Sequence, residues 1–507
     1  MRPAALGSLA STLARVKAVG YAAAGAVVSV LAFPPFGPGW LILPGIALFL
    51  WGLRGAPSPR WGLAAGAVYG LGFYAGLMWW ISELGLIAVV PLVLVQGAYP
   101  AAYAWWLTRR EESDPRIWLL LAAGGWGVME FLRYRFPVGG LEWGAAGYAL
   151  SDQAWARELA QWVGTSGLTV LVALAASAVV VTRARPRLAG SVLGGLAILA
   201  LVGVLFSPQP GFSGPPLRVA IVQGSTPCPY EHCADERYGT YLQHLELTRQ
   251  IPPGSVDLVV WAEGSTGSFN ADPVLNPEVR EAIGAEARRI GAWFLVGGDR
   301  PVSETHWVNA NVVFDPSGEI VGEYRKQRPV PFGEYIPARP LFEWIPELAA
   351  VPRDMIPGDG PVVFEADGYR LGSVISFEGA FSRFARGHVV EGAQVIVVAT
   401  NEGSYGLTPA SDQLIGMARM RASELGVPVV LSAVTGKSTI IDRTGRVSET
   451  TGLGTQEILF GEIRLGSPTP YAATGDLVLI VAALAGVLTW WSRRTLVGSR
   501  DRAFEEE

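Results

Sequence analysis

Apolar residues are distributed along this chain in three blocks. Residues 17–206 are mostly apolar, residues 217–465 mix apolar and polar positions as a globular domain does, and residues 474–492 are apolar again. A hydrocarbon core about 30 Å thick is crossed by roughly 20 apolar helical residues. The pattern therefore predicts eight membrane spans, near residues 17–33, 39–53, 61–82, 84–107, 116–134, 165–182, 188–206 and 474–492.

The middle block alternates strand and helix patterns. A buried strand is expected at 217–224 and further strands at 256–265, 292–299 and 394–403, while 369–381 is a strand that runs into a sharp turn and a helix. Helices are expected at 235–250, 277–291 and 410–426, and hairpins at 309–326 and 427–447. Strands that alternate with helices indicate an α/β domain whose helices pack on a sheet. We expect residues 1–206 to carry seven spans, residues 207–473 to form this domain, and residues 474–507 to form the last span and a tail.

Composition and charge agree with a membrane protein. The 507 residues are 50% hydrophobic and 16% charged, with a mean hydropathy of +0.32. Soluble domains have about 25% charged residues, so the low value indicates a bilayer. The formal net charge of −5 gives no reason to expect a nucleic-acid partner.

Cationic residues predict the orientation of the spans. With eight spans, five clusters fall on one side, which should be the cytoplasm. These clusters are Arg2, Arg15 and Lys17; Arg54 and Arg60; Arg109, Arg110 and Arg116; Arg183, Arg185 and Arg187; and Arg493, Arg494, Arg500 and Arg502. The domain of residues 207–473 is then extracytoplasmic. Arg133, Arg135 and Arg157 fall on the outer side and are exceptions to the pattern.

The two cysteines, Cys228 and Cys233, lie in the segment PCPYEHC of the exported domain. An extracytoplasmic location permits a disulfide between them, and two free thiols are the alternative. A zinc site that includes His232 is less favoured, because the other histidines have no ligand spacing around it. We expect no metal.

Three strand ends carry residues whose chemistry suits acyl transfer. Glu263 closes the strand VVWAE, Lys326 follows the first hairpin, and Ser376 ends the strand LGSVIS. A carboxylate can take a proton from a nucleophile, while an ammonium stabilises an oxyanion and keeps the carboxylate charged. Each residue alone is more often a solvated strand end, but the three together favour a catalytic site.

Longer motifs around these residues resemble a known family. They are EFLRYRFPVGGLEWGAAGYALSD (130–152), YRKQRPVPFGEYIP (324–337), GMARMRASE (416–424) and PTPYAATGD (468–476). The chain resembles bacterial apolipoprotein N-acyltransferases, which are nitrilase-superfamily enzymes fused to membrane helices. The resemblance implies an α-β-β-α sandwich for the exported domain. It also implies a base at Glu263, a catalytic lysine at Lys326, the nucleophile at Ser376, and supporting carboxylates at Glu334 and Glu378.

The resemblance implies a function as well. An acyl chain would pass from the sn-1 position of a phospholipid to the nucleophile, and then to the N-terminal amine of diacylglyceryl-cysteine in a lipoprotein. No organic cofactor or metal is implied. The expected location is the bacterial inner membrane, with the catalytic domain on the periplasmic side, and we expect a monomer.

The chain also departs from the family pattern. Serine stands at the position of the family's cysteine, and four neighbouring departures favour natural divergence over an engineered change: Ala262 for proline, Arg328 for histidine, Ser404 and Tyr405 at an aromatic pair, and Leu414 for histidine. An alkanol is a much weaker acid than a thiol, so Glu263 would act as a general base during attack. We expect the Ser376 hydroxyl to lie within hydrogen-bonding reach of Glu263.

Two other functions stay open at this point. Water could resolve the acyl-enzyme, which would make the protein a hydrolase or amidase, although the membrane spans argue against a soluble amide substrate. Alternatively, the serine could mark a site that has lost activity in a protein that binds lipid or lipoprotein.

Overall fold

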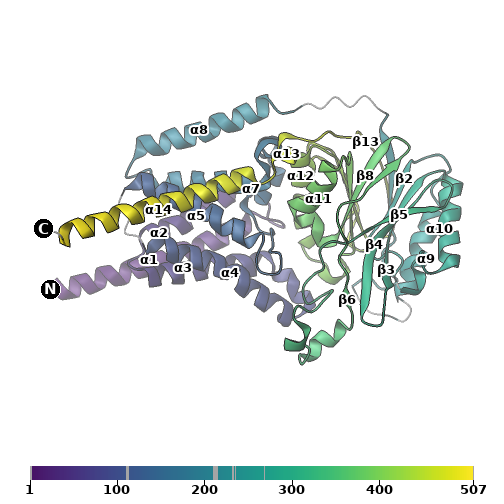
Figure 1. Ribbon diagram of the computed structural model, residues 1–507, viewed down its shortest axis with the longest axis horizontal. Coiled ribbons are helices and arrows are strands. Elements are labelled where there is room, and N and C mark those ends of the chain that lie inside the picture. The colour runs from purple at the N-terminus through teal and green to yellow at the C-terminus, as the bar shows by residue number, and fades with distance from the viewer. Residues whose placement is uncertain are drawn as a thin grey trace. The chain divides into compact units, whose positions relative to one another are not determined.

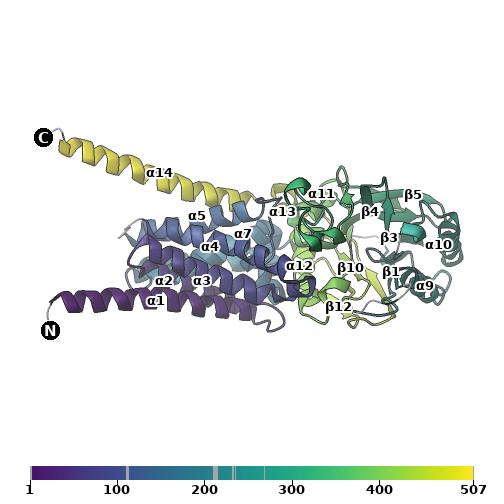
Figure 2. The ribbon, with the colours of Figure 1, turned by 90° about the horizontal axis from the view of Figure 1, so that it is seen from below.

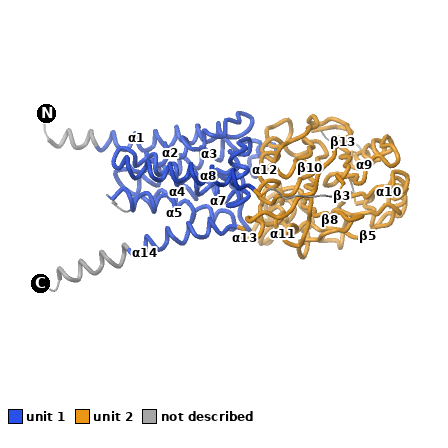
Figure 3. Tube along the Cα trace, turned by 90° about the horizontal axis from the view of Figure 1, so that it is seen from above, with its two compact units in different colours: residues 1–207, 476–507 blue, residues 208–475 orange. Residues whose placement is uncertain are grey.

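The computed structural model describes residues 3–109, 114–208, 215–230, 233, 236–267 and 269–505, with side chains described from residue 11 to residue 492. The chain forms two compact units, Met1–Ser207 with Asp476–Glu507, and Pro208–Gly475 (Figure 3). Arg2, Arg110 and His232 lie outside the described residues, as do the side chains of the cations expected after the last span, Arg493, Arg494, Arg500 and Arg502.

The first unit is built from helices. Each of the eight apolar segments contains one long helix (Figures 1 and 2): α1 (Pro3–Leu31), α2 (Ile42–Arg54), α3 (Pro59–Leu77), α4 (Leu86–Thr108), α5 (Pro115–Arg133), α7 (Ala154–Val181), α8 (Pro186–Leu205) and α14 (Leu477–Glu505). Within α7, Gly164 has a non-helical backbone (φ 67°, ψ 174°) that separates two helical stretches, 154–163 and 165–181, and the second coincides with the expected span 165–182.

Length and composition allow four helices in the described residues to cross a membrane: Ser11–Leu31, Leu86–Thr108, Ala154–Val181 and Pro186–Leu205. Two shorter apolar helices are Gly39–Arg54 and Leu477–Ser492. The chain therefore has several apolar helices where the spans were expected, and the count of eight spans stays a prediction.

Helices α3 and α4 pack closely because glycine lines their contact. A Cβ atom on Gly66 would lie 2.4 Å from the carbonyl oxygen of Pro100, and one on Gly70 would lie 2.6 Å from that of Gly97. In a bilayer, helix association depends on van der Waals packing, which small residues permit. The glycines of this segment thus have a packing role.

The three arginines that break the cation pattern are bound within the first unit. Arg133 is fully buried and donates from Nε to Glu130 Oε2 at 2.8 Å, and from Nη1 to the carbonyl oxygens of Leu141 and Trp143 at 2.8 Å each. Arg135 pairs with Asp476 at 2.8 Å, and Arg157 donates to the carbonyl of Ser151 at 2.7 Å. These contacts hold the segment between α5 and α7, so the arginines serve packing and not orientation.

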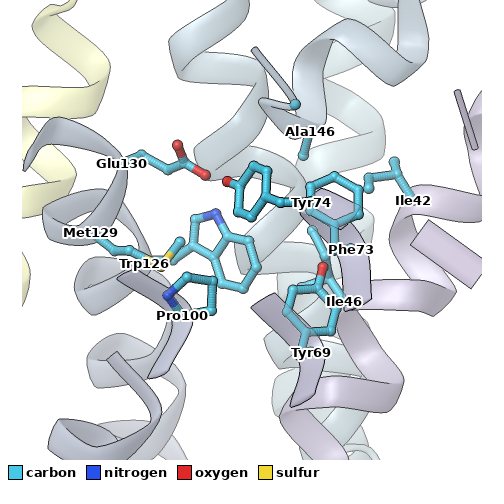
Figure 4. A pocket seen from close by; sticks show the side chains of 11 residues that line it. Ile42, Ile46, Tyr69, Phe73, Tyr74, Pro100, Trp126, Met129, Glu130 and Ala146 are labelled. Carbon is cyan, nitrogen blue, oxygen red and sulfur yellow. The ribbon is translucent and has the colours of Figure 1, made fainter. Parts of the chain in front are cut away.

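Glu130 also lines a small cavity inside the helix bundle. Figure 4 shows its carboxylate beside the hydroxyl of Tyr74, with Trp126 and Met129 on the same side. The remaining lining is mostly apolar and comes from α2, α3, Pro100 of α4, Gly144 and the start of α6 (Ala146–Ala149). The buried charge of Glu130 is balanced by Arg133, which explains how a carboxylate is tolerated there.

The second unit contains two β-sheets. The first has the order β13-β1-β2-β3-β4-β5, with β6 paired to β4, and the second has the order β12-β11-β10-β9-β8-β7. The strands of the first sheet are β1 (Leu217–Gln223), β2 (Leu258–Trp261), β3 (Trp293–Pro301), β4 (His306–Phe314), β5 (Ile320–Arg325), β6 (Asp354–Met355) and β13 (Glu457–Ile463). Those of the second are β7 (Val363–Ala366), β8 (Tyr369–Ile375), β9 (Val395–Thr400), β10 (Val429–Ala433), β11 (Thr439–Ile441) and β12 (Val447–Thr450).

Side-chain alternation along the strands separates two cores. In β1, Val219 and Ile221 join Leu371 and Val397 of the second sheet in the core between the sheets. Their neighbours in β1 face the opposite way and pack with residues of α9 (Glu236–Thr248) and α10 (Pro277–Ile290). The first sheet is thus buried on both faces.

Helices also cover the outer face of the second sheet (Figure 1), namely α11 (Ser382–Val390) and α12 (Ala410–Leu425). Close packing on β8 depends on Gly372, where a Cβ atom would lie 2.8 Å from the Cβ of His388 in α11. The four layers are the expected α-β-β-α sandwich, which is therefore confirmed.

Candidate active site

The nucleophile candidate Ser376 lies at a sharp turn. Strand β8 ends at Ile375, and Ser376 begins a short 3-10 helix that extends to Ala380. Its φ of 56° is in the left-handed region, which costs a non-glycine residue roughly 1–3 kcal/mol. Backbone strain of this kind is concentrated at functional sites, so the conformation supports a role for this side chain.

Glu378 holds that turn in place. Its carboxylate accepts hydrogen bonds from the Ile375 N–H at 2.8 Å and the Tyr324 hydroxyl at 2.8 Å. It also accepts from the backbone N–H groups of Gln327 at 2.6 Å and Arg328 at 2.9 Å. Burial raises the pKa of Glu378 to about 7, although these hydrogen bonds favour its charged form. Glu378 therefore joins the turn of Ser376 to the segment that follows Lys326.

Lys326 lies between two carboxylates. Its Nζ is 3.1 Å from Glu263 Oε1 and 2.6 Å from Glu334 Oε1, and the lysine side chain is 1% exposed. Burial lowers the pKa of Lys326, but the two carboxylates outweigh burial, so the pKa lies above its ordinary value. For Glu334, burial raises the pKa against the opposing effect of the lysine. The ammonium is held charged in a site from which water is largely excluded.

Two asparagines fix the carboxylate of Glu263. The side chain of Asn309, in β4, donates to Oε1 at 2.7 Å, and the backbone N–H of Asn401 donates to Oε2 at 3.1 Å. Asn401 follows β9 in the second sheet, whereas Glu263 follows β2 in the first. The site is therefore built where the ends of strands from both sheets meet.

Neither asparagine was predicted from the sequence. A signal was present for Asn309, because Asn309 and Asn311 interrupt a run of apolar residues in β4 and both are buried. Buried amides in a strand usually have a specific hydrogen-bond partner. Asn401 acts through its backbone N–H. Because every residue except proline has this group, the residue type carries no signal of the contact.

The expected hydrogen bond between Ser376 and Glu263 is not formed. Among the described residues no hydrogen bond joins Ser376 to Glu263, so the prediction of that hydrogen bond was wrong. The Glu263 carboxylate is instead occupied by the donors of Asn309, Lys326 and Asn401.

A further carboxyl group, Asp299, belongs to the same cluster. It pairs with Asn309 across β3 and β4, and its Oδ1 is buried without a hydrogen-bond partner among the described residues. Burial raises the pKa of Asp299 to about 8, with help from the charges of Glu263 and Glu334. At neutral pH this group is therefore mostly protonated. Asp299 was not among the predicted site residues.

Cys228 and Cys233 are joined by a disulfide. Of the two alternatives, a disulfide and two free thiols, the first is therefore found. Within the described residues, no group of three or more His, Cys, Asp or Glu side chains could hold a metal ion.

Family models match both units. The N-terminal domain of apolipoprotein N-acyltransferase matches residues 25–178, and carbon-nitrogen hydrolase matches residues 218–473. An apolipoprotein N-acyltransferase of Azotobacter vinelandii is 30% identical over 502 residues, which cover 93% of each chain. The chain belongs to the apolipoprotein N-acyltransferase family. Similar relatives of that name include those of Methylococcus capsulatus (28% identity, 97% of this chain and 99% of the relative) and Geobacter metallireducens (28%, 85% and 88%).

Membership of the apolipoprotein N-acyltransferase family accounts for both units of the chain. Together with the apolar helices of the first unit, it makes this a multi-pass protein of the bacterial inner membrane. The carbon-nitrogen hydrolase match spans the strands and turns that carry Glu263, Lys326 and Ser376.

Proposed function

We propose that this protein transfers an acyl chain from a phospholipid to the N-terminal amine of diacylglyceryl-cysteine in lipoproteins, through an acyl-enzyme on Ser376. The observation that carries the proposal is the buried Lys326, bound to Glu263 and Glu334, together with the strained turn of Ser376, which Glu378 joins to the segment after Lys326. Relatives that match nearly the whole chain are named apolipoprotein N-acyltransferases, which supports this choice among acyl-transfer reactions.

In the first step, the Ser376 oxygen attacks the ester carbonyl at the sn-1 position of the phospholipid. The bond from Oγ to the acyl carbon forms, and the bond from that carbon to the glycerol oxygen breaks. Glu263 takes the proton of the serine hydroxyl and passes it to the departing glycerol oxygen, so a lysophospholipid leaves. Catalytic hydrogen bonds often form only when substrate is bound, and the contact between Ser376 and Glu263 would form at this stage.

In the second step, the α-amine of diacylglyceryl-cysteine attacks the acyl carbon of the oxyester. The carbon–nitrogen bond forms, the bond to Oγ breaks, and a proton of the amine returns to Oγ through Glu263. The products are an amide and the free serine. Lys326 serves both steps, because its ammonium stabilises the oxyanion and keeps Glu263 charged and able to accept a proton.

The proposal includes a location and an assembly state. Both lipid substrates would be met at the outer leaflet of the inner membrane, so residues 207–473 would lie on the periplasmic side. The cation clusters between spans support this orientation. A monomer suffices, because all groups assigned to the site come from one chain.

Transfer of radiolabelled acyl chain tests the proposal. The purified protein is incubated with phospholipid labelled in its sn-1 chain and a diacylglyceryl lipopeptide. We expect label in the lipopeptide as an amide, and a loss of about 100-fold or more with Glu263→Gln, the range expected for a general base. Release of the label as free fatty acid would indicate a hydrolase instead. Absence of both products would indicate a binding protein.

A further inference from the structure

The disulfide Cys228–Cys233 lies beside a tyrosine that binds the interior of the second unit. Tyr230, two residues after Cys228, donates from its phenol to the carbonyl oxygen of Thr435 at 2.7 Å. The same oxygen accepts from the backbone N–H of Gly454 at 2.7 Å. Burial raises the pKa of Tyr230 to about 12, so the phenol keeps its hydrogen at neutral pH. The segment after β1 is thus tied to the loop after β10, which belongs to the other sheet.

Thr435 in turn contacts the segment that holds Glu263. The loop after β10 continues the parallel pairing of β10 with β9, and both the N–H and the hydroxyl of Thr435 donate to the carbonyl oxygen of Asn401 at 3.4 Å. The N–H of Asn401 donates to Glu263 Oε2 at 3.1 Å. A series of hydrogen bonds therefore leads from the phenol of Tyr230 to the carboxylate of Glu263.

Tyr230 has a backbone conformation that its surroundings must maintain. Its φ of 67° is in the left-handed region, which a residue other than glycine keeps only where neighbouring contacts fix it. Its ring lies over Gly454, where a Cβ atom would be 3.1 Å from Cε2 of the tyrosine. The disulfide restrains the chain two residues earlier, at Cys228. We therefore expect the phenol to leave Thr435 more often when the disulfide is opened.

The disulfide can be opened without altering any group of the proposed mechanism. Cys233 is exposed, and the chain contains two cysteines, so a reductant has a single target. Reduction breaks the S–S bond, takes two electrons from the reductant and leaves two thiols. In an extracytoplasmic compartment, which is oxidising, the bond would stay closed.

We propose that Tyr230 is a positioning residue for the base: held in place by the disulfide, its phenol fixes the loop after β10, and this loop keeps the Asn401 N–H directed at Glu263. The inference rests on the role of Glu263 as the base in the function proposed above. Loss of the phenol leaves every acid–base group present but lets the carboxylate move away from its productive orientation. The rate of acylation should fall, whereas substrate binding should not change.

A double-mutant cycle with an activated ester tests this inference. Release of p-nitrophenol from p-nitrophenyl octanoate in detergent is measured for the parent and Tyr230→Phe, each with the disulfide intact or removed by Cys228→Ser and Cys233→Ser together. We expect kcat to fall about fivefold on either change, the effect of one hydrogen bond, with KM unchanged. The combined variant should fall no further, because both changes act through the same contact.

Two further measurements separate positioning from misfolding. Reduction of the purified, folded parent with tris(2-carboxyethyl)phosphine, followed by alkylation of the thiols and removal of the reagents, should lower kcat as the serine pair does. The same treatment should leave kcat of Tyr230→Phe unchanged. Tyr238→Phe, on the exposed side of α9, is the matched control and should behave as the parent does.

Effects that multiply in the combined variant would overturn the inference, because independent structural losses add in free energy. An unchanged kcat in Tyr230→Phe, or a change confined to KM, would overturn it as well. The ester requires neither phospholipid nor lipopeptide, so a parent that releases p-nitrophenol but transfers no acyl chain would refute the proposed transfer reaction alone. A parent that releases no p-nitrophenol would refute Glu263 as a base and this inference with it.

Discussion

A serine hydroxyl is a much weaker acid than a cysteine thiol, and this difference determines what the residues around Ser376 have to do. A thiol can be ionised before substrate arrives, whereas the serine proton must leave during attack. In the proposed mechanism the carboxylate of Glu263, which is paired with the buried Lys326, is the base that takes this proton.

Replacing the nucleophile tests the chemistry at the level of one atom. Ser376→Cys should raise acyl-transfer activity, because a thiol is deprotonated more easily and a thioester reacts faster with an amine. The measurement is the rate of amide formation on a lipopeptide, with Ser376→Ala as the inactive control. Loss of activity with cysteine, beside an active parent, would mean that the site has become specific for a hydroxyl.

The raised pKa of Asp299 predicts that the stability of the folded protein depends on pH. Its pKa in the folded protein is raised to about 8, against about 3.9 for an aspartate in an unfolded chain. Between these values the folded state holds a proton that the unfolded state has lost, so the free energy of unfolding falls as the pH rises from about 4 to about 8, then levels off.

Asp299→Asn removes this titration. The Tm of the variant minus that of the parent should grow from about pH 6 to about pH 8 and stay constant at higher pH, measured by thermal unfolding in detergent. Asp359→Asn, on an exposed position, is the control and should give a small difference that does not change with pH. A pH-independent difference for Asp299→Asn would show that this carboxyl is ionised throughout.

The sequence predicted part of this cluster and missed the rest for physical reasons. Glu263, Lys326 and Ser376 stand at strand ends, where a polar residue after an apolar run is visible along the chain. Asn401 contributes a backbone N–H, which every residue except proline has, so its role depends on the meeting of two sheets. Asp299 is unusual because folding buries it and brings two other carboxylates, distant in sequence, near it.

At the scale of elements, the site depends on close contact between β3 and the turn after β2. A Cβ atom on Gly297 would lie 2.2 Å from the carbonyl oxygen of Ala262 and 2.7 Å from the Cα of Glu263. The absence of a side chain there lets β3 pass beside the backbone that carries Glu263.

Gly297→Ala should therefore displace the Glu263 turn. Overpacking typically costs about 1–3 kcal/mol, so we expect a lower Tm together with a loss of acyl transfer. Gly360→Ala is the matched control, because a Cβ atom there has no neighbour within 4 Å. Wild-type activity and Tm in Gly297→Ala would contradict the described packing.

Element types were more predictable than element bounds. The alternation of apolar residues predicted most strands and helices of the second unit but not β7 or β13, and Asp315–Gly318 forms the turn of the first hairpin as expected. In the first unit, Gly164 separates two helical stretches of α7, and the second, 165–181, coincides with the expected span 165–182. The stretch 154–163 lay outside the predicted spans.

At the scale of the whole molecule, the chain leaves the helical unit at Ser207 and returns to it at Asp476. If the helices cross the membrane as the cation clusters predict, residues 220–460 lie outside the cytoplasm. Reporter fusions after residues 56, 112, 185 and 500 should give a cytoplasmic signal, and fusions within 220–460 a periplasmic one. A cytoplasmic signal from 220–460 would contradict the orientation and remove access to outer-leaflet substrates.

The central claim is that Ser376 carries the acyl chain between donor and acceptor. Its most direct test is mass spectrometry of the purified protein after incubation with phospholipid alone, followed by peptide mapping. The account predicts one acyl chain, bound to the peptide that contains Ser376, which disappears when a diacylglyceryl lipopeptide is added. An acyl chain on another residue, or amide formation by a Ser376→Ala variant, would contradict the account.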